Sequence, residues 1–571
     1  MMKAIYYFRR LICGIFVCSL CACSDYLDVA PTDQLDENAA FSSESNADLF
    51  LNTVYGNMPD ETSANFTTYD GMEHWSDNVC NKFDWAISWV QQVSRSYSAE
   101  TFYDGLYNHG YPAIPFMYNM AYRYIRSCNL FIAKIEEFKD NYSKEWYNKR
   151  WGEAVFLRAY LYHNMWKAYG GVPVITEPLN RLTMGDEIFR PRNTAQETYE
   201  FLVKDLQKAA DVLPNEIGTG RATRGAALTL KGYVELHYHK YAEAAKTNKT
   251  VIDEGIYQLF PGFNELFYEQ NSNNCESIYA FQHGAKVRSQ ENQYFGPNCG
   301  VNRNDAWGCM QPTVSLANDY RMKNGLPITD PKSGFDPQNP YKNREPRFDW
   351  SIVHHGSVWR GDTISTMEGS LDAPNPAAEK RTGMWRRKGM NENITTSGFN
   401  TDGMNFILFR YAEVLLNYAE AKIELNELDE SVIEAIDQIR RRGQIPGLKE
   451  TYGKASFSQQ ELRRICRQER RIELAFEYKR YWDLIRWGNL PDGDPHKTDY
   501  YTAEVELNKP FKGYKIATDG TYSEFDVHQS VFHKDKNYLF PLFRTWILQN
   551  PKIEGQNGGP DNWVNGQNYG Y

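Results

Sequence analysis

Long stretches of this chain carry apolar residues at the 3.6-residue spacing of an amphipathic helix, and sustained strand-like alternation is nearly absent. The segment 145–169 is the clearest example, because its apolar residues form one stripe and Gly170, Gly171 and Pro173 end it. A helix with such a stripe must bury it against other elements. The sequence therefore predicts a mainly α-helical protein.

Several further helices are predicted by the same spacing. They begin at Phe41, at Met120 and at an N-cap provided by Asn193 or Thr194, and they fill the segments 221–255 and 409–443. Each of the last two segments breaks in the middle, at His239 and at the 426–429 turn, and so forms a helix pair. Helix pairs of roughly 34 residues indicate tetratricopeptide-like stacking, here divergent and separated by long insertions.

The middle of the chain has a different composition. From 259 to 405 it is rich in Gly, Pro, Asn and aromatic residues, so we expect loops and turns there, and loops of that length are usually functional. Calcium is an alternative for its Asp-rich loops. No EF-hand loop is present, however, so we expect 330–336 to be a turn and expect no cofactor.

The N-terminal residues determine the expected compartment. Basic residues precede an apolar run of 12 residues that ends at Ala22, too short for the ~20 residues of a membrane-spanning helix. Leu20 and Ala22 before Cys23 fit a bacterial lipoprotein signal, with an ordinary secretory signal as the alternative. We expect residues 1–22 to be a signal peptide and 23–571 to be a body tethered through lipid on Cys23.

Composition excludes some functions. A net charge of -10 and a pI near 5.7 leave no basic face for nucleic acid. The sequence contains no nucleophile elbow, phosphate loop, dinucleotide fingerprint or two-His zinc helix, so we predict no enzyme and no metal site.

Six cysteines in the body do not form a disulfide framework. Cys299 and Cys309 are close enough in sequence to form a disulfide across a loop, and free thiols are an equally compatible alternative.

Aromatic residues reach 15% of the chain, and some of them are candidates for ligand contact. A sugar ring has a face of C–H groups and a rim of hydroxyls, so a binder needs an exposed aromatic plane and short polar side chains. Both ingredients occur in the segment 69–90 and in the loop-rich middle. The predicted ligand-binding residues are Trp75, Asp77, Asn78, Trp85, Trp89, Tyr294, Trp307, Trp359 and Trp385. The alternative for each tryptophan is a small core beneath a loop.

The segment 469–488 is dense in Glu, Arg and Asp. The pairs Glu477 with Arg480, Arg480 with Asp483 and Asp483 with Arg486 are each three residues apart, and an apolar stripe accompanies them. We therefore predict one continuous scaffold helix with a ladder of charged pairs, and not a catalytic centre.

The order of several motifs resembles the SusD/RagB family of outer-membrane nutrient-binding lipoproteins of the Bacteroidetes. The motifs are "CSDYLD" (23–28), "EAVFLRAYLYHNMWKAYGGVPVI" (153–175), "NPYKNREPRF" (339–348), "RYAEVLLNYAEA" (410–421), "ERRIELAFEYKRYWDLIRWG" (469–488), "LFPLF" (539–543) and "NPKIEGQNGG" (550–559). Because they occur in sequence order over nearly the full length, the resemblance covers the whole body.

The resemblance implies a fold in which four divergent tetratricopeptide-like helix pairs support a loop-rich ligand-binding part. We expect the scaffold mainly in 41–255 and 405–490, and the binding part mainly in 60–115 and 259–405. It also implies a lipid-anchored protein exposed on the outer membrane that captures oligosaccharides without cleaving them. The implied partner is a SusC-like TonB-dependent transporter.

Two other functions fit the same architecture. The RagB branch of the family implies peptide cargo, which is held by backbone pairing and apolar pockets rather than by exposed tryptophan planes. A tetratricopeptide scaffold that organises protein partners and binds no nutrient is the third hypothesis.

Overall fold

The structure is a computed structural model. It describes residues 37–58, 72–83, 113–284, 291–301, 303–375, 381–393, 403–534, 537–540, 542 and 544–554.

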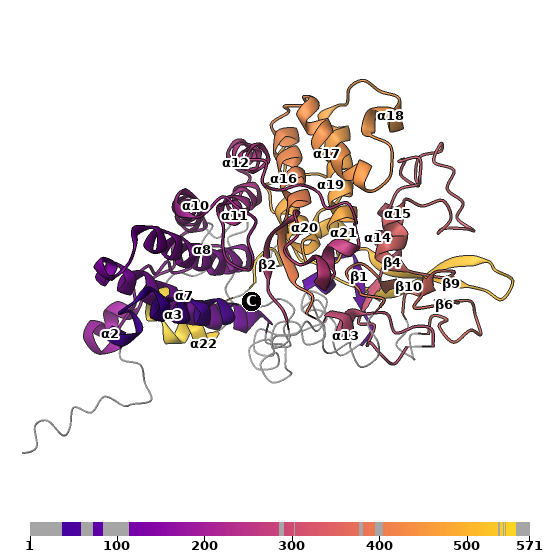
Figure 1. The fold of residues 1–571 in the computed structure, drawn as a ribbon. Coiled ribbons are helices and arrows are strands. Elements are labelled where there is room, and N and C mark those ends of the chain that lie inside the picture. Colours follow the sequence, from indigo (N-terminus) through magenta and orange to yellow (C-terminus); the bar gives the residue numbers. More distant parts are fainter. Residues whose placement is uncertain are drawn as a thin grey trace, which may run out of the picture.

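Helices dominate the described residues, as predicted (Figure 1). They include α3 (Glu44–Gly56), α7 (Ala113–Glu137), α8 (Lys144–Tyr169), α10 (Ala195–Val212), α11 (Arg224–His237), α12 (Tyr241–Asp253), α16 (Tyr411–Glu424), α17 (Glu430–Arg442), α19 (Gln459–Glu473) and α20 (Arg480–Gly488). From α7 to α12 each of these helices contacts the next, α12 contacts α16, and α16 contacts both α17 and α19. Successive helices therefore stack as the repeat pattern predicted.

The helix ends follow from local chemistry. Ser43 caps α3, and Thr194 caps α10 in a capping box with Glu197. His239 and Asn426 take left-handed backbone conformations, with φ of 58° at each, between the two helices of their pairs. Both predicted breaks are confirmed.

The predicted continuous helix over 469–488 is wrong. The helix α19 ends at Glu473, and Phe476 (φ 65°) and Tyr478 (φ 59°) are left-handed before α20 begins. Of the predicted charged ladder, Asp483 and Arg486 do pair at 3.0 Å. The other members bind partners far away in sequence: Glu477 binds Arg410 and Lys388, and Arg480 binds Asp77.

The loop-rich part carries short strands in antiparallel pairs. They are β1 (Val79–Asn81) with β3 (Met310–Pro312), β2 (Ser277–Phe281) with β8 (Phe406–Arg410), β4 (Ile352–Val353) with β7 (Trp385–Arg386), β5 (Val358–Trp359) with β6 (Asp362–Thr363), and β9 (Pro510–Ile516) with β10 (Tyr522–Gln529). Short helices α13 (Glu291–Phe295), α14 (Val314–Asp319) and α15 (Pro346–Ser351) lie among them, and α18 (Leu448–Tyr452) connects α17 to α19. Figure 1 shows β4, β9 and β10 on the side of the molecule away from α3 and α8. The strand β2 instead lies next to α8, where the Tyr279 and Phe156 ring centroids are 5.0 Å apart.

The two ends of the described chain meet. The helix α22 (Arg544–Gln549) lies beside α3 and α7 in Figure 1. There the Trp546 ring stacks on Tyr118 with ring centroids 4.1 Å apart. Among the described residues, no helix is both long and apolar enough for a bilayer span.

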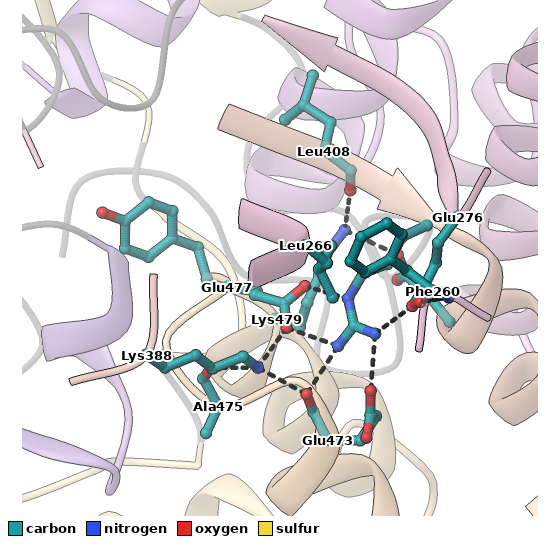
Figure 2. A network of polar contacts seen from close by, with 12 residues as sticks. Phe260, Leu266, Glu276, Lys388, Leu408, Glu473, Ala475, Glu477 and Lys479 are labelled. Carbon is teal, nitrogen blue, oxygen red and sulfur yellow. Dashed lines mark hydrogen bonds and ion pairs between the residues drawn. The ribbon is translucent and has the colours of Figure 1, made fainter. Parts of the chain in front are cut away.

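A buried charged cluster joins the helical and loop-rich parts (Figure 2). Arg410, at the end of β8, contacts Glu276, Glu473 and Glu477, each at 2.7 Å, and Lys388 contacts Glu477 at 2.6 Å. We call these five residues the Arg410 network. In Figure 2 the labelled carboxylates and Lys388 point toward one centre.

These charges are almost completely removed from water, with side chains at most 7% exposed. Burial alone would raise the pKa of Glu473, but the guanidinium groups of Arg442, Arg410 and Arg347 outweigh it and hold that pKa far below its usual value. Burial lowers the pKa of Lys388 to about 8 despite its contact with Glu477. Because each charge has a partner, the network is stable only as a complete set.

We predict that Glu473→Gln lowers the free energy of unfolding by about 3–5 kcal/mol, because it leaves buried arginines without a countercharge. The matched control is Glu434→Gln, which breaks an ion pair with Arg441 in which both side chains are more than half exposed. That change should cost less than about 1 kcal/mol. Denaturation in guanidinium chloride measures both, and equal losses would contradict a special role for the network.

Candidate functional site

Three half-buried aromatic side chains from distant segments lie together in the loop-rich part. The Tyr294 and Trp307 ring centroids are 5.2 Å apart at an interplanar angle of 87°, and Phe83 lies 6.2 Å from Trp307 at the same angle. We call Phe83, Tyr294 and Trp307 the aromatic platform. Two of its members, Tyr294 and Trp307, were predicted as ligand contacts from the sequence.

Strand pairing positions Phe83. The strand β1 pairs with β3, with Asn81 opposite Met310, and the Lys82 N–H donates to the Cys309 carbonyl (3.2 Å) just beyond the strand end. The Asn81 side chain then turns the chain by accepting from the Phe83 N–H at 2.9 Å.

Backbone hydrogen bonds also hold the other two rings. The Trp307 N–H donates to the Gln293 carbonyl at 2.8 Å, and the Cys309 N–H donates to the Tyr294 carbonyl at 2.9 Å. Gly308 lies between them with φ 65°, and a Cβ there would come within 2.1 Å of the Asn298 side chain. Only glycine fits this turn, which places the segments that carry Trp307 and Tyr294 beside each other.

Polar groups surround the platform. The Lys82 ammonium lies 4.9 Å from the Phe83 ring centroid. Asp305, two residues before Trp307, is held by Arg360 at 2.5 Å, with both side chains at most 10% exposed. Flat rings beside hydrogen-bonding groups can hold a ligand that has one apolar face and a polar rim.

Trp75 does not offer a face to a ligand. Its side chain is 2% exposed and makes edge contacts with the rings of Tyr481, Trp482 and Phe540, at centroid distances of 5.5, 6.4 and 5.4 Å. The prediction that it is an exposed plane is therefore contradicted, because long-range packing covers it.

Asp77 and Asn78 are also buried, at 2% and 0% exposure. Asp77 forms ion pairs with Arg471 at 2.7 Å and with Arg480 at 2.8 Å. Asn78 donates to Glu73 at 2.6 Å and accepts from Arg471 at 2.9 Å. Both side chains tie the segment before β1 to α19 and α20, and neither points to a ligand site.

Trp359 and Trp385 lie in a small separate core together with Cys299, Val353, Ile364 and Met390. Their exposures are 2% and 1%, so both follow the alternative of a core beneath loops. Trp385 still serves the platform indirectly. Its indole N–H donates to Asn298 Oδ1 at 2.7 Å, and Asn298 is the residue against which Gly308 turns.

The other predicted positions, Trp85, Trp89 and the lipidated Cys23, lie outside the described residues. Phe83 was missed by the sequence analysis, although it lies two residues before Trp85 in the same aromatic segment. Its closeness to Trp85 was the sequence signal that could have marked Phe83 as a candidate ligand contact.

Cysteines and acidic loops give no metal site in the part of the chain that the structure describes, where no cluster of His, Cys, Asp or Glu could hold an ion. Cys299 and Cys309 are both buried and belong to different hydrophobic clusters. In the 330–336 segment, Asp330 accepts from the Lys332 N–H at 2.8 Å, as expected for a turn.

Comparisons with known proteins agree with this architecture. Residues 275–563 match the model of the SusD family, and residues 25–234 match a model described as starch-binding associating with outer membrane. SusD-like protein P38 of Formosa agariphila is 24% identical over 561 residues, which span 93% of this chain and 95% of that protein.

Solved structures show the same fold. A SusD-like protein from Bacteroides fragilis superposes with a TM-score of 0.73 at 27% identity, covering 92% of this chain and 99% of that one. A SusD-like carbohydrate-binding protein from the same species gives 0.73 at 24% identity, covering 90% and 100%. A surface glycan-binding protein A from Bacteroides uniformis gives 0.62 at 18% identity, covering 90% and 99%.

The chain belongs to the SusD family. The predicted mainly helical SusD-like fold is thereby confirmed. Members of this family are binding proteins and not catalysts, and the family is associated with the outer membrane.

Asp77 gives this region a testable pH dependence. Burial would raise its pKa, but Arg471 and Arg480 lower it from the usual 3.8 to about 2. As the pH falls, Asp77 therefore binds a proton at a higher pH in the unfolded chain than in the folded chain. Ionised Asp77 therefore contributes fully to the free energy of unfolding above about pH 4. About 2 kcal/mol of that free energy is lost as the pH falls toward 2.

We predict that Asp77→Asn removes this part of the acid destabilisation, so that unfolding free energy falls less between about pH 4 and 2 than in the wild type. At neutral pH the variant should be less stable by about 3–5 kcal/mol, because two buried guanidinium groups lose a countercharge. Chemical denaturation at several pH values measures both effects. An unchanged pH slope would contradict the assignment.

Proposed function

We propose that this chain is a cell-surface lipoprotein that captures an oligosaccharide on the aromatic platform and delivers it, uncleaved, to a SusC-like TonB-dependent transporter. The observation that carries the proposal is the meeting of Phe83, Tyr294 and Trp307, half-buried and on segments held by backbone hydrogen bonds, in the loop-rich part. The match to a starch-binding family associated with the outer membrane supports it, as do the carbohydrate-binding and glycan-binding proteins among the structural relatives.

The platform suits carbohydrate for a physical reason. An indole or phenol face covers the C–H face of a pyranose ring, while the hydroxyl rim remains free to pair with polar side chains. Rings held by the backbone lose little entropy when a ligand arrives. Trp85 and Trp89 follow Phe83 closely in sequence and remain proposed contacts of the same ligand.

Anchoring makes modest affinity sufficient. A binder tethered through lipid on Cys23 beside its transporter raises the local concentration of ligand at the pore, so transfer does not need tight binding.

Capture of the oligosaccharide also needs no cleavage of its bonds. Asp305, the nearest carboxylate to Trp307 in sequence, is already occupied by Arg360.

We predict that the purified body, residues 24–571, binds at least one oligosaccharide of a plant and algal glycan panel in titration calorimetry. Trp307→Ala should weaken that binding at least tenfold, about 1.4 kcal/mol, because it removes the central ring of the platform. The matched control is Trp350→Ala on α15, a half-buried tryptophan that stacks on Phe263 and contacts no platform ring.

Three results would contradict the proposal. Equal weakening by the two tryptophan variants would reject the platform as the site, and release of shorter sugars during the titration would reject binding without cleavage. Binding of a peptide panel with no response to any glycan would favour the RagB-like alternative.

A further inference from the structure

A second concave site lies away from the aromatic platform. A cleft of about 410 Å³ opens between the 318–331 segment, the helices α18 and α19, and Tyr501. Its volume falls within the ~300–1,000 Å³ of small-molecule sites. Tyr294, Trp307 and Phe83 are not among its lining residues, so the cleft is separate from the platform.

One wall of the cleft is aromatic and apolar. The half-buried Tyr452 ring, at the end of α18, meets Phe457 edge to face with centroids 5.8 Å apart. Ile465, Pro327 and Pro331 add aliphatic carbon to the lining. An aromatic ring flanked by aliphatic carbon is a surface on which the C–H face of a sugar ring can lie.

Other lining residues present hydrogen-bonding groups. Arg464 is exposed, its guanidinium lies 5.6 Å from the Tyr500 ring centroid, and it forms no ion pair with any acidic group in the described chain. Gln468 donates its amide N–H to the Asp319 carbonyl at 2.8 Å, which leaves its own amide oxygen for a ligand. Arg464 supplies donors and Gln468 an acceptor, as paired hydroxyls require.

Tyr501, another lining residue, is held by its own contacts. Its hydroxyl donates to Asp319 at 2.8 Å, its N–H donates to Glu506 at 3.0 Å, and its backbone is left-handed at φ 54°. A side chain held in that conformation by two hydrogen bonds is part of a built surface.

The loop wall is equally rigid. The Asp330 N–H donates to the Pro327 carbonyl at 3.0 Å, and the Ser333 N–H donates to the Asp330 carbonyl at 2.9 Å. These turns use the backbone groups that an extended peptide would need for pairing. A prolyl-rich wall already in place also keeps the entropy cost of binding low.

The charge of the lining selects against acidic ligands. Asp319, Asp330 and Glu461 line the cleft together with Arg464, the single cation among its lining residues. Asp319 is paired with Arg471 at 2.6 Å, and Glu461 contacts Lys454, whereas Asp330 serves only its own turn. An anionic ligand would approach these carboxylates unfavourably, and a neutral one would not.

We propose that this cleft is a second carbohydrate site, which holds one or two neutral pyranose rings against Tyr452, Arg464 and Gln468. The inference shares its class of ligand with the proposed function, but it uses none of the residues of the platform. The two sites can therefore fail separately.

The test uses saturation-transfer NMR on the body, residues 24–571, with methyl glycosides of glucose, galactose, mannose and xylose at millimolar concentration. The cleft variant combines Thr329→Trp, which fills the cleft from an exposed lining position, with Arg464→Ala. Lys332→Trp, on the same loop but outside the lining, is the matched control. The platform variant combines Tyr294→Ala with Trp307→Ala.

We expect the cleft variant to lose about half or more of the saturation of at least one glycoside and the control to lose none. When the cleft and platform variants are combined, we expect their separate losses of saturation to add. Unchanged saturation in the cleft variant would overturn the second site and leave the platform intact. Loss in the cleft variant with none in the platform variant would uphold the cleft and reject the platform. The absence of saturation in the wild type would also reject the cleft, while calorimetry with longer glycans still tests the platform.

Methyl glucuronide distinguishes neutral from acidic ligands. In the platform variant we expect it to saturate less than methyl glucoside, because the carboxylates of the cleft repel it. Stronger saturation by the glucuronide would overturn the assignment of a neutral ligand.

Discussion

Buried arginine–carboxylate pairing is the interaction on which the rest of this structure depends. Arg410 on β8 binds Glu276, Glu473 and Glu477, which belong to the segment before β2, to the end of α19 and to the break before α20. Removing such charges from water costs several kcal/mol for each ion, and only complete pairing offsets that cost. The Arg410 network therefore fixes where the helical part ends and the loop-rich part begins, and it specifies one arrangement of the two.

The same chemistry reaches the candidate site through the segment before β1. Glu73 accepts from the backbone N–H groups of Phe476 and Tyr478 at 3.0 Å each, and Asp77 pairs with arginines on both sides of the α19 to α20 break. This segment continues into β1 and then into Phe83. The platform is thus connected through a few residues to the most heavily bonded part of the core, which is how a loop-borne site keeps a fixed geometry.

The helices could be predicted because their periodicity and caps are local, as at Thr194 and Asn426. The structure of the 469–488 segment could not be predicted. Charged residues spaced three apart fit an exposed ladder on one helix, but they fit equally well with buried partners elsewhere in the chain. Arg410, the partner of Glu477, is 67 residues away. The tryptophans show the same limit. Trp75 and Trp307 have similar polar neighbours in sequence, and only the distant rings of Tyr481 and Phe540 decide that Trp75 is covered.

The residues that stabilise the fold and the residues of the two proposed binding sites are different, and this difference bears on ligand specificity. The buried charges need distant partners and tolerate little change, whereas the rings of the platform and Tyr452 of the cleft are only half-buried, so fewer contacts constrain the residues around them. If both sites hold pyranose rings, one long glycan that reaches both is bound more tightly than either site alone allows, because the second contact forms at a high effective concentration. Length would then be selected by the fixed spacing of two rigid sites, and the kind of sugar by the side chains around each ring.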